Sequence, residues 1–138
     1  MRYIGLDLGT KTLGIAISDR TGLIASFYKT LEFKEEDYNS LIEPLKEIIN
    51  NEKIESIVLG LPKNMNNSIG FAGERSLSFK KILEENFDIP VNLEDERLSS
   101  VEANNLLIEG DLSRKKRKKK VDALAATIIL QRYLDRRD

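Results

Sequence analysis

The change in apolar period along the chain is the feature that most constrains its fold. Residues 2–8 alternate between apolar and other side chains, a pattern that predicts a β-strand. Residues 9–11 then form a predicted tight turn, residues 12–18 its hairpin partner and residues 23–31 a third strand. The N-terminal part of the chain is therefore predicted to be an antiparallel meander.

Beyond residue 35 the apolar residues recur at helical spacing, interrupted by short apolar runs of strand length. Helices are predicted over about 36–51, 71–86 and 121–135, a short helix near Ser99, and strands over 54–61 and 90–94. Strands that alternate with helices form parallel sheets, because each crossover helix returns the chain to the same edge. We therefore predict one α/β domain over residues 1–138, with three antiparallel strands followed by two parallel strands.

The chain has neither cysteine nor histidine among its 138 residues. This excludes disulfides, zinc–thiolate sites, thiol nucleophiles and Ser-His catalysis. Any metal must be held by oxygen atoms, which favours magnesium, manganese or calcium. No apolar run approaches the roughly 20 residues of a membrane helix, and Asp7 interrupts the apolar N-terminus, which argues against a signal peptide. A cytoplasmic location is expected by default.

Three acidic residues lie far apart in the sequence, at positions suited to a shared site. Asp7 lies at the end of the first predicted strand, Glu96 just past the last strand, and Asp122 at the start of the last predicted helix. Two divalent ions about 4 Å apart stabilise the charge that develops in phosphodiester cleavage, and they need several carboxylates on rigid elements. If folding brings the three together, they form a site for Mg²⁺ or Mn²⁺ that hydrolyses phosphodiesters.

Each of these acids also has a structural explanation. Asp7 would accept hydrogen bonds from the following turn, although its apolar neighbours make an unpaired carboxylate costly there. Glu96 would pair with Arg97, and Asp95 competes with Glu96 as the inward-facing acid. Asp122 would interact favourably with a helix dipole. No single acid decides between the two interpretations.

Seven of the 22 basic residues form one uninterrupted run just before Asp122. The members of this basic run are Arg114, Lys115, Lys116, Arg117, Lys118, Lys119 and Lys120. The rest of the chain holds 15 basic and 23 acidic residues, a balance of −8, so positive charge is concentrated in one predicted loop. This favours contact with a nucleic-acid backbone. A solvated flexible loop is the alternative.

A polar loop over residues 62–70 joins a predicted buried strand to a predicted helix. Ligands commonly bind at the carboxyl ends of strands in such sheets. Lys63, Asn64 and Asn66 would contact phosphates or bases there, or would form a solvated turn.

At these residues the chain closely resembles the YqgF/RuvX family, RNase H-like nucleases related to the Holliday junction resolvases. Four motifs carry the resemblance: GLDLGTKTLGIAISD (5–19), VLGLPKNM (58–65), DERLSSVEA (95–103) and KKVDALAA (119–126). The resemblance implies an RNase H-like mixed sheet flanked by helices. It also implies a catalytic, metal-binding trio of Asp7, Glu96 and Asp122, which selects Glu96 over Asp95.

The family's suggested role implies a nucleic-acid substrate. That role is processing of the pre-16S rRNA 5′ end in ribosome biogenesis, with ribosomal particles as expected partners. Cleavage of branched DNA is proposed by analogy with the resolvases. Lys11, Arg97 and the basic run would hold the substrate backbone, together with Lys63 and Asn64.

The chain departs from the family pattern in two places. Asn67 takes the place of a glycine, and Phe71-Ala72 replaces the family's Pro-Arg, so the loop lacks an arginine. Asn tolerates the left-handed conformation, which favours survival of the turn. Lys11 stands where many members have arginine; it keeps the charge but loses bidentate phosphate geometry.

Two other functions are weighed against nucleolysis. The hairpin around Asp7 also resembles the phosphate-gripping turn of actin-like ATPases and sugar kinases, but those proteins close two such domains around the nucleotide, and 138 residues supply one. A non-catalytic RNA- or ribosome-binding factor is the other alternative, against which the complete acidic trio argues.

The sequence is compatible with a monomer or a homodimer. A resolvase that cuts two strands symmetrically needs a two-fold dimer.

Overall fold

The computed structural model describes residues 1–62, 70–95 and 114–136, with only the backbone described for residues 114–123. Its elements, in chain order, are β1 (Tyr3–Leu8), β2 (Thr12–Ser18), β3 (Ala25–Glu32), the 3-10 helix η1 (Tyr38–Leu41), α1 (Ile42–Asn51), β4 (Ser56–Leu61), α2 (Phe71–Asn86), β5 (Val91–Asp95) and α4 (Arg114–Arg136). No described helix is both long and apolar enough to cross a membrane. The short helix predicted near Ser99 lies outside the described residues.

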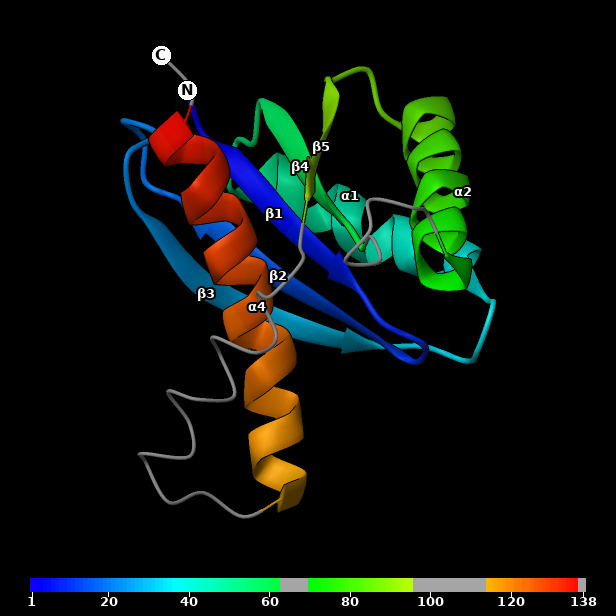
Figure 1. Cartoon of the computed structure of the whole chain (residues 1–138). Coiled ribbons are helices and arrows are strands. Elements are labelled where there is room, and N and C mark those ends of the chain that lie inside the picture. The colour runs from blue at the N-terminus through cyan, green and yellow to red at the C-terminus, as the bar shows by residue number, and fades with distance from the viewer. Residues whose placement is uncertain (63–69, 96–113, 137–138) are drawn as a thin grey trace.

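The five strands form one mixed sheet in the order β3-β2-β1-β4-β5 (Figure 1). β1 pairs antiparallel with β2, and β2 pairs antiparallel with β3, with a register shift between Ile15 and Ala16. β1, β4 and β5 run parallel, so their carboxyl ends lie at one edge of the sheet. The predicted α/β architecture is confirmed: three antiparallel strands come first, and two strands parallel to β1 follow.

Strand alternation divides the core into two layers, one on each face of the sheet. Ile4, Leu6 and Leu8 of β1 pack on the face covered by α1 and α2. Tyr3 and Gly5 lie on the opposite face, under α4. Figure 1 shows α4 crossing one side of the sheet and α1 and α2 on the other. The alternation that predicted β1 as a strand thus also decides which β1 residues face α4.

The last helix begins earlier than predicted. We expected it over about 121–135, after a basic loop, but α4 runs over Arg114–Arg136 and its first seven residues are the basic run. Lysine and arginine are good helix formers, so the chain continues as helix through the run. Asp122 consequently lies in the third turn of α4, not the first. The helix dipole acts within the first turn and no longer explains this acid.

The helix predicted over 36–51 is divided into η1 and α1. Pro44 supplies the reason, because in an α-helix its ring would clash with the carbonyl group of Ser40, four residues earlier. The α-helix therefore starts only at Ile42, and Pro44 lies in its first turn, where its missing N–H costs nothing.

Candidate active site

Asp7 lies near the carboxyl end of β1 and is half-buried. In the strand's alternation it shares the α4 face with Tyr3 and Gly5. The following turn is closed by the backbone of the hairpin itself: the Gly9 N–H donates to the Thr12 carbonyl oxygen over 2.8 Å. Asp7 is thus carried by a central strand of the sheet. It lies between the buried core and the edge of the sheet where β1, β4 and β5 end.

Helix α4 packs against β1 in an antiparallel direction. The rings of Tyr3 and Tyr133 lie 5.7 Å apart, and a Cβ built on Gly5 would lie 2.7 Å from Leu130 Cβ and 3.2 Å from the Ala126 carbonyl oxygen. Moving from Tyr3 to Gly5 along β1 therefore moves backwards along α4, from Tyr133 to Ala126. The turn of α4 that precedes Ala126 lies toward the end of β1 that carries Asp7.

Asp122 belongs to that preceding turn. It stands four residues before Ala126, a spacing that places two residues on one face of a helix. Its backbone is described, while its side chain, like those of the basic run, is not among the described parts of the chain.

The end of β5 carries two acids on opposite faces of the sheet. Val91 and Leu93 pack into the α1–α2 core, so Asp95 lies on that face by alternation, away from Asp7. Glu94 lies on the α4 face and is buried to 7% exposure. Arg136 Nη2 lies 2.7 Å from both of its carboxylate oxygens. Glu94 is thus paired with a residue of α4.

The ion pair between Glu94 and Arg136 was not predicted from the sequence. The signal was present in the two-residue period of the strand, which assigns Glu94 to the same face as Asp7. The partner at the far end of α4 had no sequence signal, since 42 residues separate the two.

Arg75 of α2 is a second residue that sequence reasoning missed. Its Nη1 donates to Thr10 Oγ1 over 3.1 Å, which brings α2 against the turn that follows Asp7. Its guanidinium carbon lies 5.9 Å from the centroid of the Phe71 ring. Arg75 stands three residues after Ala72, on the same side of the predicted helix as the position where the family has arginine. That spacing was the available signal.

The remaining predicted contact residues divide into two groups. Lys11 is exposed at the tip of the β1–β2 turn, next to Thr10. Lys63, Asn64, Asn66, Glu96 and Arg97 lie outside the described residues. Within the described part of the chain, no three acidic residues form a group that could hold a metal ion. Glu96 and the Asp122 side chain do not belong to that part, so the predicted trio stays a prediction.

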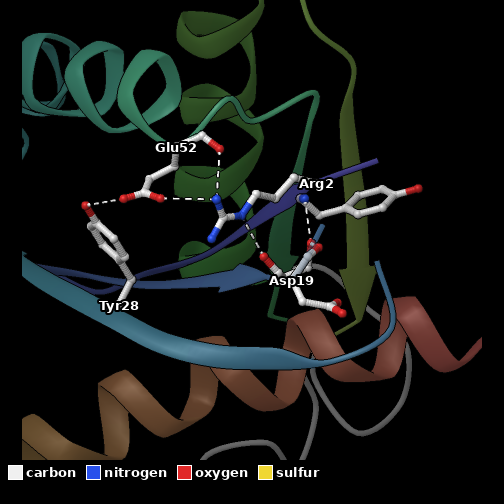
Figure 2. A network of polar contacts seen from close by, with 6 residues as sticks. Arg2, Asp19, Tyr28 and Glu52 are labelled. Carbon is white, nitrogen blue, oxygen red and sulfur yellow. Dashed lines mark hydrogen bonds and ion pairs between the residues drawn. The ribbon is translucent and has the colours of Figure 1, made fainter. Parts of the chain in front are cut away.

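A polar network lies at the opposite end of β1 (Figure 2). Arg2 forms an ion pair of 3.2 Å with Glu52 and donates from Nε to the Ser18 carbonyl oxygen over 2.9 Å. Tyr28 Oη lies 3.4 Å from Glu52 Oε1. Burial, followed by the charge of Glu52, raises the pKa of Tyr28. These contacts tie β1 to β2, β3 and the end of α1.

Asp19 shapes the turn between β2 and β3. Thr21 Oγ1 donates to its carboxylate, as do the backbone N–H groups of Leu23 and Ile24. The hydroxyl bond to Thr21 and these backbone bonds lower the pKa of Asp19 from 3.8 to about 2. β3 therefore begins at Ala25 instead of the predicted residue 23, since Leu23 and Ile24 belong to the turn. This acid stabilises a turn at the end of the sheet away from Asp7.

Known proteins resemble this chain over nearly its whole length. The sequence model of the RuvX family, described as "Holliday junction resolvase", matches residues 1–136. A protein of Clostridium kluyveri is 52% identical over 136 residues, which cover 99% of this chain and 98% of the relative. A protein of Bacillus subtilis (strain 168) is 49% identical over 135 residues, 98% of each chain. Both are named "Putative pre-16S rRNA nuclease".

Solved structures extend the likeness to the fold. RuvC of Thermus thermophilus aligns with a TM-score of 0.56 at 15% identity, covering 97% of this chain and 94% of RuvC. The Fowlpox virus resolvase, solved with Holliday junction DNA, aligns with a TM-score of 0.55 at 14% identity over 98% of this chain and 97% of its own. At these identities the likeness concerns the fold, which is that of the RuvC-like, RNase H-like resolvases. Together with the family match over nearly the whole sequence, it leads to one conclusion: this chain is a member of the RuvX family.

Proposed function

We propose that this protein is a divalent-metal-dependent endonuclease that hydrolyses phosphodiester bonds in structured nucleic acid, with the pre-16S rRNA as its substrate. The observation that carries the proposal is the packing of α4 on β1. Gly5 touches Ala126 and Leu130, and this register supports convergence of Asp122 with Asp7 on one face of the sheet. The names of the relatives at about 50% identity support the choice of substrate.

Asp7, Glu96 and Asp122 would hold the metal. Their donor set fits a hard cation, since carboxylate oxygens are the ligands that Mg²⁺ and Mn²⁺ prefer, and the chain has no histidine or cysteine to favour a softer ion. Asp95 lies on the face away from Asp7, which supports Glu96 as the acid from this segment. When bound, the metal supplies charge stabilisation and an activated water.

The chain's own residues position the substrate. β1 and α4 pack closely at Gly5 within a buried apolar cluster, so they fix the direction of acids at their ends. The basic run occupies the N-terminal end of α4, where the helix dipole and repulsion between like charges disfavour cations. A bound phosphate backbone would offset the unfavourable interaction with the helix dipole and reduce the repulsion between the cations. This supports a role for the basic run in binding nucleic acid.

The proposed partners are the rRNA precursor and the ribosomal particles that contain it, in the cytoplasm. Branched DNA is the second candidate substrate, favoured by the description of the RuvX family and by the fold shared with resolvases. A resolvase requires a two-fold dimer, so a monomer in solution argues for the RNA substrate.

The test compares Asp7 and Asp95, two acids assigned to opposite faces of the sheet. Purified wild type, Asp7→Asn and Asp95→Asn are incubated with end-labelled pre-16S rRNA and with a four-way DNA junction, in Mg²⁺, Mn²⁺ or EDTA. We expect wild type and Asp95→Asn to cut the RNA only with a divalent ion, and Asp7→Asn to be inactive with an unchanged melting temperature. Faster cleavage of the junction selects the resolvase function. If Asp7→Asn cuts as fast as wild type, the proposal is wrong, and a wild type that binds the RNA without cutting it is a non-catalytic factor.

A further inference from the structure

Phe71 is an exposed aromatic side chain at the start of α2. At 77% exposure it is the most exposed of the large apolar side chains in the described part of the chain. Its neighbours in the same turn include buried Gly73, so the helix itself is packed while this ring faces solvent. Burial in the core therefore does not explain Phe71.

Arg75 approaches this ring one turn further along the helix. The guanidinium carbon lies 5.9 Å from the ring centroid, near the outer limit of about 6 Å for a cation–π contact. Arg75 Nη1 donates to Thr10 Oγ1 over 3.1 Å, so the guanidinium is held between α2 and the β1–β2 turn. The arginine thus covers part of the ring and leaves the rest open to solvent.

Among the described residues, Arg75 has few hydrogen-bond partners for its side chain. A guanidinium has five N–H donors. Within the described part of the chain, the buried Arg75 Nε has no hydrogen-bond partner and no carboxylate forms an ion pair with Arg75. A buried donor of a charged group that stays unpaired destabilises the protein. The Arg75 guanidinium donates to the neutral hydroxyl of Thr10, which does not balance its charge. It is therefore suited to bind an anion.

The position of this pair connects it to the candidate active site. Thr10 lies three residues after Asp7, and the exposed cation Lys11 follows it. The turn is tight, with Gly9 N–H bonded to the Thr12 carbonyl oxygen. A phosphate bound by Arg75 beside Thr10 would therefore lie next to the edge of the sheet that carries Asp7.

We propose that Phe71 and Arg75 form a binding platform for one unpaired nucleotide of the substrate, an inference that rests on the proposed function. The base stacks on the open part of the Phe71 ring, as bases of single-stranded RNA stack on aromatic side chains. Arg75 binds the phosphate, for which its planar fork of donors is well matched. Thr10 positions Arg75. The preferred substrate has an unpaired nucleotide beside the cleaved bond, because a base within a duplex has no free face to offer.

The test measures binding separately from cleavage. All variants are made in full-length protein carrying Asp7→Asn, and two probes are used: a single-stranded RNA of about 12 nucleotides that contains 2-aminopurine, and its blunt duplex. Phe71→Ala should weaken single-strand binding about tenfold, since stacking of one base contributes that much or more. It should also abolish the quenching of 2-aminopurine and leave duplex binding within about twofold.

Arg75→Ala and Arg75→Lys examine the phosphate contact. Arg75→Ala should weaken binding of both probes about tenfold and lower the salt slope by about 0.7 on the single strand, as expected when one phosphate is no longer neutralised. Arg75→Lys should keep the slope without restoring full affinity, because lysine keeps the charge and loses the fork. Phe27→Ala, an exposed phenylalanine on β3, and Lys81→Ala, an exposed cation on α2, are matched controls and should bind like the parent.

The outcomes separate this inference from the proposed function. If Phe71→Ala and Arg75→Ala bind like their controls while wild type cleaves RNA, the platform is wrong and the nuclease function stands. Equal losses on both probes for Phe71→Ala overturn the stacked base. A parent protein that binds neither probe overturns the platform, and a wild type that also fails to cleave overturns the nuclease. Unchanged circular dichroism spectra confirm that each variant is folded.

Discussion

Gly5 of β1 packs so closely against α4 that a Cβ on this residue would lie 2.7 Å from Leu130 Cβ. The Ala126 carbonyl oxygen lies 3.2 Å from the same point. Both neighbours belong to the helix that carries Asp122, and Gly5 lies two residues before Asp7 on the same face of the strand. The absence of a side chain at Gly5 thus fixes how near α4 comes to the candidate active site.

Substituting Gly5 with alanine is expected to destabilise the fold by about 1–3 kcal/mol, because overpacking a core forces backbone shifts. Urea unfolding measures the change. Leu130→Ala alone leaves a cavity and should cost about 2–5 kcal/mol. In the double variant the Leu130 Cβ stays, but the space left by the shortened side chain lets α4 and β1 shift and relieves part of the clash, so the double variant should be more stable than the sum of the two changes predicts. A Gly5→Ala variant as stable as wild type would contradict the close packing. Slower cleavage by folded Gly5→Ala is also expected.

Removing the partner of Glu94 is expected to destabilise the protein. Arg136→Met leaves a buried carboxylate without its charged partner, which costs about 1–3 kcal/mol. The exposed position of the Arg136 side chain, at 66%, keeps the cost below that of a fully buried pair. Glu94→Gln in the same background should recover part of the loss, because it removes the unpaired charge. Equal stability of Arg136→Met and wild type in urea would contradict this role.

The pH dependence of stability is expected to change when Asp19 is replaced with asparagine. The pKa of Asp19 is lowered to about 2 in the folded chain, so the ionised carboxylate stabilises the folded state above its usual pKa near 4. That contribution is lost as the pH falls from about 4 toward 2. Wild type should therefore exceed Asp19→Asn in stability at pH 5, and the difference should shrink toward pH 2. Thermal melts across this range measure it, and a difference that is constant with pH would contradict the prediction.

Neutralising part of the basic run is expected to weaken nucleic-acid binding without unfolding the helix. Replacing Lys118, Lys119 and Lys120 with glutamine keeps helix propensity and removes three charges. The slope of log K against log salt should fall by up to about 0.7 for each phosphate of single-stranded RNA that the variant no longer neutralises. Replacing Lys46, Lys80 and Lys81 with glutamine makes the same change of charge on α1 and α2. Equal slopes for the two triple variants would show that the run binds no backbone.

The sequence alone determined the elements whose pattern is local. α2 begins and ends at the predicted residues, Phe71 and Asn86, and the three-stranded meander is present because period-two alternation and turn residues act within a few positions. The start of α4 was predicted wrongly for a local reason as well. A run of cations was interpreted as a loop from its charge, whereas the helix propensity of lysine and arginine prevails.

The candidate site was only partly accessible from the sequence. Alternation assigned Asp7 to one face of β1, but which element covers that face depends on the order of the strands and the crossing of α4. The predicted roles of Glu96, Asp122 and the basic run remain predictions. The resemblance to a family named these residues, because spacing along the sequence does not determine whether their side chains come together.

Contacts between distant residues were decided by the tertiary structure. Arg75 meets Thr10 across 65 positions, and Arg136 meets Glu94 across 42. Each partner alone is an ordinary polar residue on a helix, strand or turn. Local periodicity fixes which way a side chain faces, because it follows from backbone geometry within one element. Which residue it faces follows from register and packing between elements, and these depend on the burial of the whole core.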